Sequence, residues 1–353
     1  MQRQTTKWQC YTKGERSSRR QIRINQLDYL KCIFILLMII FHLVYIGDKY
    51  PYLKQVVYTF HMPAFFIISG YLLNVDKGVR SFCNTMLWMF IPYAVMETGY
   101  VCMSSVLPVR EKVEEVSLNI ILYKIFVAPI GPYWYLHTLL ICSLVYYTLN
   151  RLCEQLNRTS FLLILGICFW GIAYLTKILS LANAVYFIAG VAICQSRQNF
   201  LSVFQPSAIA IIPFILLSCF PENLDRSTLA GVVITYVTIS FLLFLHEYIP
   251  DGLRKISYFV GCNTFPILLF SPIFTMLSRL FIPFFSFDTS GICFMCVAVC
   301  LVVLGCLLLA LLVDKIGLSR FLVGKECLLN TDLSHEITFS LKRGFTLLRY
   351  ILL

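Results

Sequence analysis

Long apolar runs recur along this chain from Tyr29 almost to its C-terminus. A helix needs about 20 predominantly apolar residues to cross the roughly 30 Å hydrocarbon core of a bilayer, and many of these runs approach that length. The chain is 59% hydrophobic and only 13% charged, which is well beyond what a soluble protein of 353 residues needs to fill its core. We therefore expect an all-α, polytopic transmembrane helix bundle with the lipid bilayer as its main solvent.

Ten apolar windows are candidate membrane spans: residues 29–46, 56–73, 86–107, 133–149, 161–176, 181–194, 203–219, 229–245, 264–285 and 292–313. An even number of spans places both termini on one side of the membrane. Residues 118–130 are too short to span and include Lys124, so we expect an interfacial or re-entrant segment there.

The charge distribution indicates the orientation. In a soluble protein, the formal net charge of +11 would suggest a nucleic-acid partner. Eight of the Lys and Arg residues, however, lie among the first 31 residues, which is typical of a cytoplasmic membrane anchor. We expect a basic cytoplasmic tail at 1–26, a membrane domain at 27–316 and a cytoplasmic, surface-lying tail at 317–353. Both termini are then cytoplasmic, and no nucleic-acid partner is expected.

Most of the fifteen cysteines fall inside apolar runs, where they act as small hydrophobic residues. Cys293, Cys296 and Cys300 share one helical face, a pattern that can indicate a metal site. No His or carboxylate joins them at ligand spacing, so no metal is expected.

Ionisable residues inside spans are functional candidates, because burying a charge in hydrocarbon is costly. Lys31 and His42 lie eleven positions apart in the first span, which places them within ~20° of one helical face and ~16 Å apart along the axis. Asp28 precedes Lys31 by one turn, so the two are either a functional pair or a simple ion pair around a snorkelling lysine. His42 is surrounded by apolar residues and must find a partner or line a cavity.

The second span has the sequence FHMPAFFIISGYL at residues 60–72. Pro63 frees a backbone carbonyl, and the pair Ser69 and Gly70 allows another helix to approach closely. His61 is compatible with either a structural or a functional role.

Four further ionisable residues lie within or beside the expected spans. Glu97 lies in the middle of the third span, where a carboxylate must be paired or functional. We expect His137 to be structural because it lies near a membrane face. His246 and Glu247 lie at a helix end, where solvation is the simplest expectation.

Several short segments together match the motifs of one family of membrane enzymes. Residues 27–31, LDYLK, precede His42 in the way that an L-D-x-[LR]-[KR] stretch precedes a His in that family, and residues 60–72 match F-x-M-P-x-F-F-x-x-S-G-[YF]-L. Further matches are GPYWYL at 131–136, YFIAG at 186–190 and GCNTF at 261–265. Through residues 25–313 the chain resembles the membrane acyltransferase-3 superfamily, particularly its fucose 4-O-acetylase-like bacterial members.

This resemblance implies an inner-membrane O-acyltransferase that moves acetyl from acetyl-CoA to a hydroxyl of a cell-envelope or exported polysaccharide, or of its lipid-linked precursor. Residues 27–316 would then be the acyltransferase domain. The implied catalytic residues are His42, Lys31 and Asp28. The implied substrate-binding residues are His61, Ser69, Glu97, Trp134 and Asn263.

The sequence also departs from the family pattern. A basic cluster usual before the I-P-Y motif is absent, leaving only Lys77 and Arg80 nearby. Position 31 is lysine where arginine is commoner, which replaces a bidentate phosphate contact with a point charge.

Two other functions remain open from the sequence. A transporter or flippase for an envelope glycan precursor would use the same buried charges to line a permeation path. A structural or sensory membrane module would need no reaction at all. Dependence on acetyl-CoA separates both from an enzyme.

Overall fold

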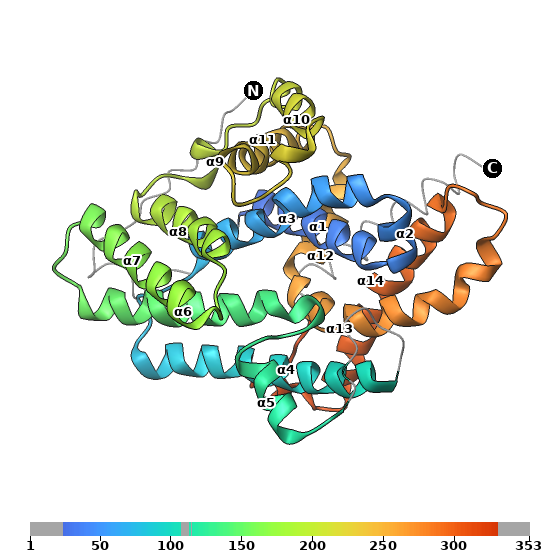
Figure 1. Ribbon diagram of the computed structural model, residues 1–353, viewed down its shortest axis with the longest axis horizontal. Helices are drawn as coiled ribbons and strands as arrows, with labels where there is room; N and C mark the ends of the chain where they lie inside the picture. Colours follow the sequence, from blue (N-terminus) through green and yellow to red (C-terminus); the bar gives the residue numbers. More distant parts are fainter. Residues whose placement is uncertain (1–23, 107–112, 114, 331–353) are drawn as a thin grey trace.

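The computed structural model describes residues 24–106, 113 and 115–330, and every regular element within them is a helix (Figure 1). The all-helical fold expected from the sequence is confirmed for these residues. In chain order the elements are α1 (Asn25–His42), α2 (Val44–Lys49), α3 (Pro51–Leu72), α4 (Val79–Val106), α5 (Leu118–Phe126), η2 (Gly131–Tyr133), α6 (Trp134–Leu152), α7 (Arg158–Thr176), α8 (Leu181–Gln195), α9 (Phe200–Val203), α10 (Ile211–Ser218), η3 (Pro221–Asn223), α11 (Leu229–His246), α12 (Asp251–Cys262), α13 (Thr264–Leu277), η4 (Ser278–Phe285), α14 (Ile292–Lys315) and α15 (Ser319–Val323).

Six helical segments in the described part of the chain are long and apolar enough to cross a membrane: Asn25–His42, Val79–Ser105, Arg158–Thr176, Leu229–His246, Thr264–Phe285 and Ile292–Lys315. There are seven if α5 and Gly131–Leu152, which meet at a bend of 41°, form one span. This bent pair fits the interfacial or re-entrant segment expected at 118–130.

The expected count of about ten spans is not confirmed. The window at 203–219 contains only the end of the four-residue α9 and the eight-residue α10, with Pro206 between them. Proline removes a backbone donor and interrupts helices, which accounts for the break. The window at 181–194 corresponds to α8, which is apolar but only 15 residues long.

Helix α1 lies in the middle of the bundle beside α3, and it also packs against α11, α12, α13 and α14 (Figure 1). Its buried side chains include several consecutive positions, so more than one face of the helix is covered: Leu27, Asp28, Tyr29, Leu30, Cys32, Phe34, Ile35, Met38, Ile39 and Phe41. The helix ends at His42, where Leu43 turns to an extended conformation before α2 begins. The sequence had predicted a continuous span from 29 to 46, and the break places His42 at a helix terminus.

Three glycines bring two pairs of helices into backbone contact, α3 with α8 and α12 with α1. A Cβ added at Gly70 of α3 would lie 2.2 Å from the carbonyl oxygen of Phe187, and one at Gly190 of α8 would lie 2.0 Å from that of Ile67. The close approach expected at Ser69 and Gly70 is therefore confirmed. A Cβ at Gly261 of α12 would lie 1.8 Å from the carbonyl oxygen of Asp28, so α12 contacts the first turn of α1 just as closely.

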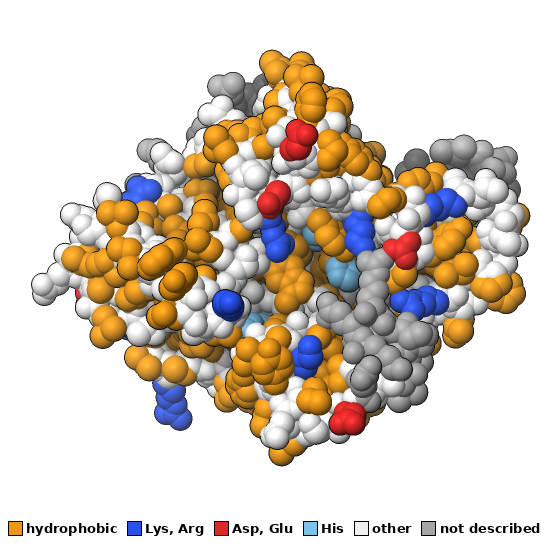
Figure 2. All heavy atoms as spheres, in the orientation of Figure 1, with side chains coloured by type: hydrophobic (Ala, Val, Ile, Leu, Met, Phe, Trp, Pro, Cys, Tyr) orange, Lys and Arg blue, Asp and Glu red, His pale blue; other side chains and the backbone are white. Residues whose placement is uncertain are grey.

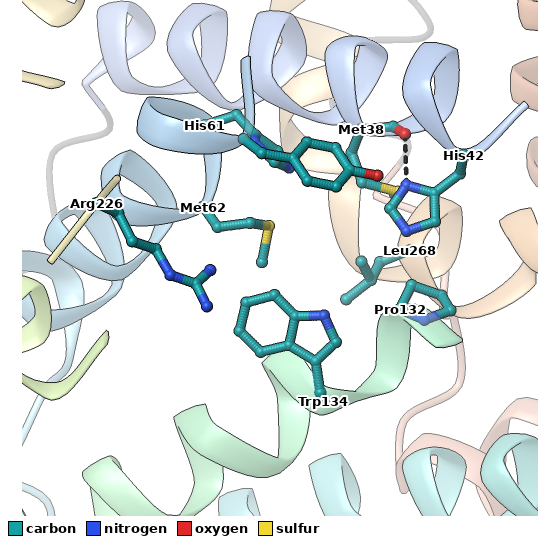
Figure 3. A pocket seen from close by; sticks show the side chains of 9 residues that line it. Met38, His42, His61, Met62, Pro132, Trp134, Arg226 and Leu268 are labelled. Carbon is teal, nitrogen blue, oxygen red and sulfur yellow. Dashed lines mark hydrogen bonds between the residues drawn. The ribbon is translucent and has the colours of Figure 1, made fainter. Parts of the chain in front are cut away.

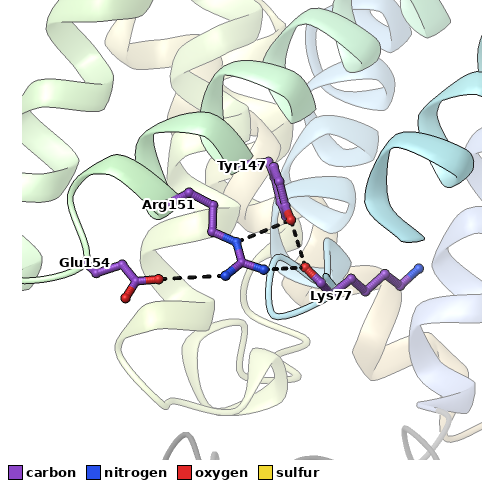
Figure 4. A network of polar contacts seen from close by, with 4 residues as sticks. All are labelled: Lys77, Tyr147, Arg151 and Glu154. Atoms are coloured by element: carbon purple, nitrogen blue, oxygen red, sulfur yellow. Dashed lines mark hydrogen bonds and ion pairs between the residues drawn. The ribbon is translucent and has the colours of Figure 1, made fainter. Parts of the chain in front are cut away.

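A polar network joins the loop after α3 to the end of α6 (Figure 4). The Tyr147 hydroxyl and the Arg151 guanidinium both donate to the carbonyl oxygen of Lys77, at 2.8 and 2.9 Å. Arg151 also lies 3.8 Å from Glu154. The side chain of Lys77 points away from this network, so the network fixes the loop through its backbone.

Candidate functional site

A cavity of ≈ 80 Å³ lies where five segments of the bundle meet (Figure 3). Its lining comes from α1, α3, the η2–α6 junction, the loop before α11, and α13: Met38, His42, Tyr58, His61, Met62, Pro132, Trp134, Arg226 and Leu268. On the surface in Figure 2, this face is hollowed near its centre, with histidine side chains inside the hollow and Lys or Arg side chains at its rim. Three predicted site residues, His42, His61 and Trp134, meet here.

The end of α1 sets the orientation of His42. Its Nδ1 lies 2.7 Å from the carbonyl oxygen of Met38, one turn earlier. Because a carbonyl can only accept, Nδ1 carries the proton, and Nε2 of the neutral ring carries the lone pair. Figure 3 shows the ring extending into the cavity. The backbone of α1 thus fixes the tautomer that a general base requires.

His61 repeats this arrangement on α3. Its Nδ1 lies 2.8 Å from the carbonyl oxygen of Val57, so the same tautomer is favoured. The ring of Tyr58 lies between the two imidazoles, with its centroid 6.2 Å from that of His42 and 5.1 Å from that of His61. The two histidines and the tyrosine therefore form one wall of the cavity.

Trp134 and Arg226 form the opposite wall. Gly131, at a φ of +62°, turns the chain into η2, and α6 then begins at Trp134. The guanidinium of Arg226 lies 5.4 Å from the centroid of the Trp134 ring. The backbone of Arg226 is held by the Tyr186 hydroxyl, which donates to its carbonyl oxygen at 2.8 Å. A cation and an aromatic face therefore stand across the cavity from two imidazoles.

Lys31 and Asp28 do not line this cavity. Their side chains form an ion pair at 2.7 Å near the start of α1, with Asp28 buried and Lys31 only partly exposed. Lys31 and His42 lie eleven positions apart on α1, or ~16 Å along the axis. If Lys31 and Asp28 take part in the reaction as predicted, they act from the N-terminal end of α1.

Three predicted substrate-binding residues also lie elsewhere, each held by other protein groups. The Ser69 hydroxyl lies 2.8 Å from that of Tyr135, and Glu97 Oε1 accepts from the backbone of Ile130 at 2.7 Å. The Asn263 side chain accepts from the backbone N–H of Asn330 at 2.8 Å and donates to the backbone carbonyl of Phe259 at 2.9 Å. These contacts join segments of the fold, and the substrate-binding roles of the three residues stay predictions.

The two remaining histidines, His137 and His246, both contact other parts of the fold. His137 Nε2 lies 3.0 Å from the carbonyl oxygen of Phe126, which fits the structural role expected for it. His246 is buried, with Nε2 2.7 Å from the Tyr258 hydroxyl, so its expected solvation is wrong. Tyr258 belongs to α12, so this helix contacts His246 at the end of α11, while Glu247 is exposed as expected.

Sequence reasoning missed Arg226 and Tyr58. Arg226 lies between η3 and α11, and a charged loop residue is ordinarily solvated. Tyr58 lies two residues before the motif at residues 60–72, and three positions before His61, which places both side chains on one helical face. That spacing was the available signal for Tyr58, whereas Arg226 had none.

Within the described ranges, no three His, Cys, Asp or Glu side chains lie close enough to hold a metal ion. The cysteines in these ranges are free thiols, and Cys293, Cys296 and Cys300 are exposed on α14. The cavity therefore offers imidazole, guanidinium, phenol and indole groups as its chemistry.

Comparison with curated proteins and comparison with solved structures each gave no significant match. A family model for acyltransferase-3, described as an acyltransferase domain, matches residues 24–311. This match includes every residue that lines the cavity and most of the described helices. The chain therefore belongs to the acyltransferase-3 family.

Proposed function

We propose that this protein is an integral membrane O-acyltransferase that moves an acetyl group from acetyl-CoA to a hydroxyl of a cell-envelope or exported polysaccharide, or of its lipid-linked precursor. Family membership supports the acyl transfer. The observation that carries the mechanism is His42, whose Nδ1–H is directed at the carbonyl of Met38 while its ring extends into a cavity. No feature of the cavity favours a transporter over this reaction.

The proposed step uses His42 as a general base. Its Nε2 takes the proton of the acceptor hydroxyl while that oxygen attacks the thioester carbonyl. The new C–O bond forms and the C–S bond breaks. The departing CoA sulfur then takes the proton from the imidazolium, which restores the neutral ring. His61 and Trp134 would contact the acceptor, since they line the same cavity.

Lys31 and Asp28 are proposed to meet the donor's anionic part near the start of α1. The ion pair at 2.7 Å would orient the Lys31 ammonium. The extended arm of CoA between its phosphates and its thioester would then follow α1 toward His42. This places donor and acceptor contacts at opposite ends of one helix.

The direct test measures CoA release by the purified full chain in detergent, with acetyl-CoA and an envelope glycan fraction supplied as donor and acceptor. We expect release that depends on His42. A flippase or a structural module would leave the thioester intact, so the absence of any release would contradict the proposal. Mass spectrometry of the envelope polysaccharide, with and without the gene, should show a difference of one acyl group per modified unit.

The proposed location is the inner membrane, with both termini cytoplasmic, because basic tails favour that side. The start of α1 would then face the cytosol, where acetyl-CoA is available. Reporters fused before Met1 and after Leu353 should both report the cytoplasm. Opposite locations for the two reporters would contradict this topology.

A further inference from the structure

Arg226 is the cationic side chain that lines the cavity, and none of the nine lining residues is acidic. Among the residues that the structure describes, none forms a hydrogen bond or ion pair with its guanidinium. The neighbouring Asp225 is exposed, and its Oδ1 accepts from the backbone of Ser227 at 2.8 Å. The donors of the guanidinium fork are therefore available to a ligand in the cavity.

The surroundings of Arg226 favour binding of an anion to its guanidinium. Its guanidinium packs over Trp134, and Figure 3 shows it directed into the space beside Met62. Partial burial lowers the pKa of Arg226 from its ordinary value, because it removes hydration from the charged form. A carboxylate bound there would restore the lost interactions through two parallel hydrogen bonds.

The cation and the proposed base line the same cavity. Arg226 and His42 point into it from opposite sides. A compact ligand that contacts both side chains at once, such as a single sugar, would therefore carry its anionic group on one side and its hydroxyl on the other. CoA fits this geometry poorly, because its extended arm separates its phosphates from its thioester.

We infer that the acceptor is an anionic sugar, whose carboxylate binds Arg226 while the hydroxyl to be acylated faces Nε2 of His42. This inference rests on the proposed function and names its substrate class. Trp134 supports the guanidinium from one side and holds its plane in the cavity. A neutral acceptor would leave the partly buried charge of Arg226 with only the exposed Asp225 as a nearby counter-charge.

The test compares two probes that differ only at the sixth carbon, methyl glucuronide and methyl glucoside. Binding to the full chain in detergent is measured from the rise in thermal unfolding midpoint as each probe is titrated, without donor. We expect the glucuronide to bind about tenfold to a hundredfold more tightly, as a charged hydrogen bond to carboxylate implies. Arg226→Gln should abolish this preference, and Arg226→Lys should retain part of it.

Arg158→Gln is the matched control, because this exposed arginine donates to the carbonyl of Ala192 and does not line the cavity. It should keep the full preference. Equal binding of the two probes, including no binding of either, would overturn the inference, as would a preference that persists in Arg226→Gln. Loss of CoA binding in Arg226→Gln would assign the guanidinium to the donor and also overturn it.

The same experiment separates this inference from the proposed function. Probe binding is measured without donor, so it is readable even if the protein releases no CoA. Selective glucuronide binding without CoA release would leave the anion site standing and contradict acyl transfer. CoA release with equal binding of both probes would support acyl transfer and contradict the anion site.

Discussion

The two ends of α1 both carry polar groups in an apolar helix, yet the protein uses them differently. At the C-terminal end, His42 is oriented by a backbone carbonyl and its ring extends into a cavity. At the N-terminal end, Asp28 and Lys31 pair with each other beneath α12, near the buried contact between His246 and Tyr258. Helical spacing places residues on one face, but the neighbouring helices decide which of them meet a cavity.

The largest expected effect follows from removing the proposed base at the cavity end. His42→Ala should lower the rate of acyl transfer by about 10²–10⁴-fold, which is the range for loss of general base catalysis. Expression and membrane insertion should change little, because Ala is compatible with an apolar helix. CoA release by equal amounts of purified wild type and variant measures the loss.

The matched variant at the other end is His246→Ala, which removes the contact with Tyr258 at 2.7 Å. We expect it to lower the thermal unfolding midpoint while retaining most of the activity per folded molecule. If His42→Ala retains near-normal activity, or if both variants lose activity equally, the assignment of catalysis to the cavity end is wrong.

A second prediction tests how tightly the N-terminal end of α1 is held. Gly261→Ala should destabilise the protein by about 1–3 kcal/mol, because the new Cβ meets the Asp28 backbone at 1.8 Å and backbone cannot easily move aside. Gly252→Ala lies in the same helix with nothing within 4 Å of the added Cβ, so it should be neutral. Thermal unfolding of the two variants in detergent makes the comparison, and similar midpoints would contradict the close packing of α12 on α1.

Sequence patterns pointed to lining residues of the cavity on helices, but not to the lining residue on a loop. Three residues that the sequence singled out, His42, His61 and Trp134, line the cavity from α1, α3 and α6, while their roles stay predictions. Arg226 was missed because its position depends on how the loop before α11 returns over Trp134, and no local pattern encodes that path.

The same limit explains the errors in the fold. Hydropathy counts apolar windows, but it does not show that Pro206 separates two short helices or that α12 covers His246. Asn263 and Ser69 match family motifs, yet the structure shows them joining segments of the protein. A motif alone therefore does not distinguish a packing contact from a substrate contact.

A third prediction asks whether the ion pair end takes part in catalysis. Lys31→Ala should lower activity by about tenfold or more, because a charged contact with the donor would be lost. Lys31→Arg should retain more activity, since it keeps the charge and the pair with Asp28. The Michaelis constant for acetyl-CoA should rise in Lys31→Ala. Equal loss in both variants, without a change in that constant, would leave Lys31 with a structural role only.

The smallest expected effect concerns Tyr58, which stands between the two imidazoles. Its hydroxyl lies 3.4 Å from the carbonyl oxygen of Phe41, a long contact that should contribute little. Tyr58→Phe keeps the ring and should change activity by less than about threefold, whereas Tyr58→Leu removes the aromatic contacts and should cost more. A loss in Tyr58→Phe as large as that of His42→Ala would show that the hydroxyl takes part in proton transfer. The base would then be His42 at the end of α1 acting together with Tyr58 of α3, and proton transfer would still belong to the cavity end of α1.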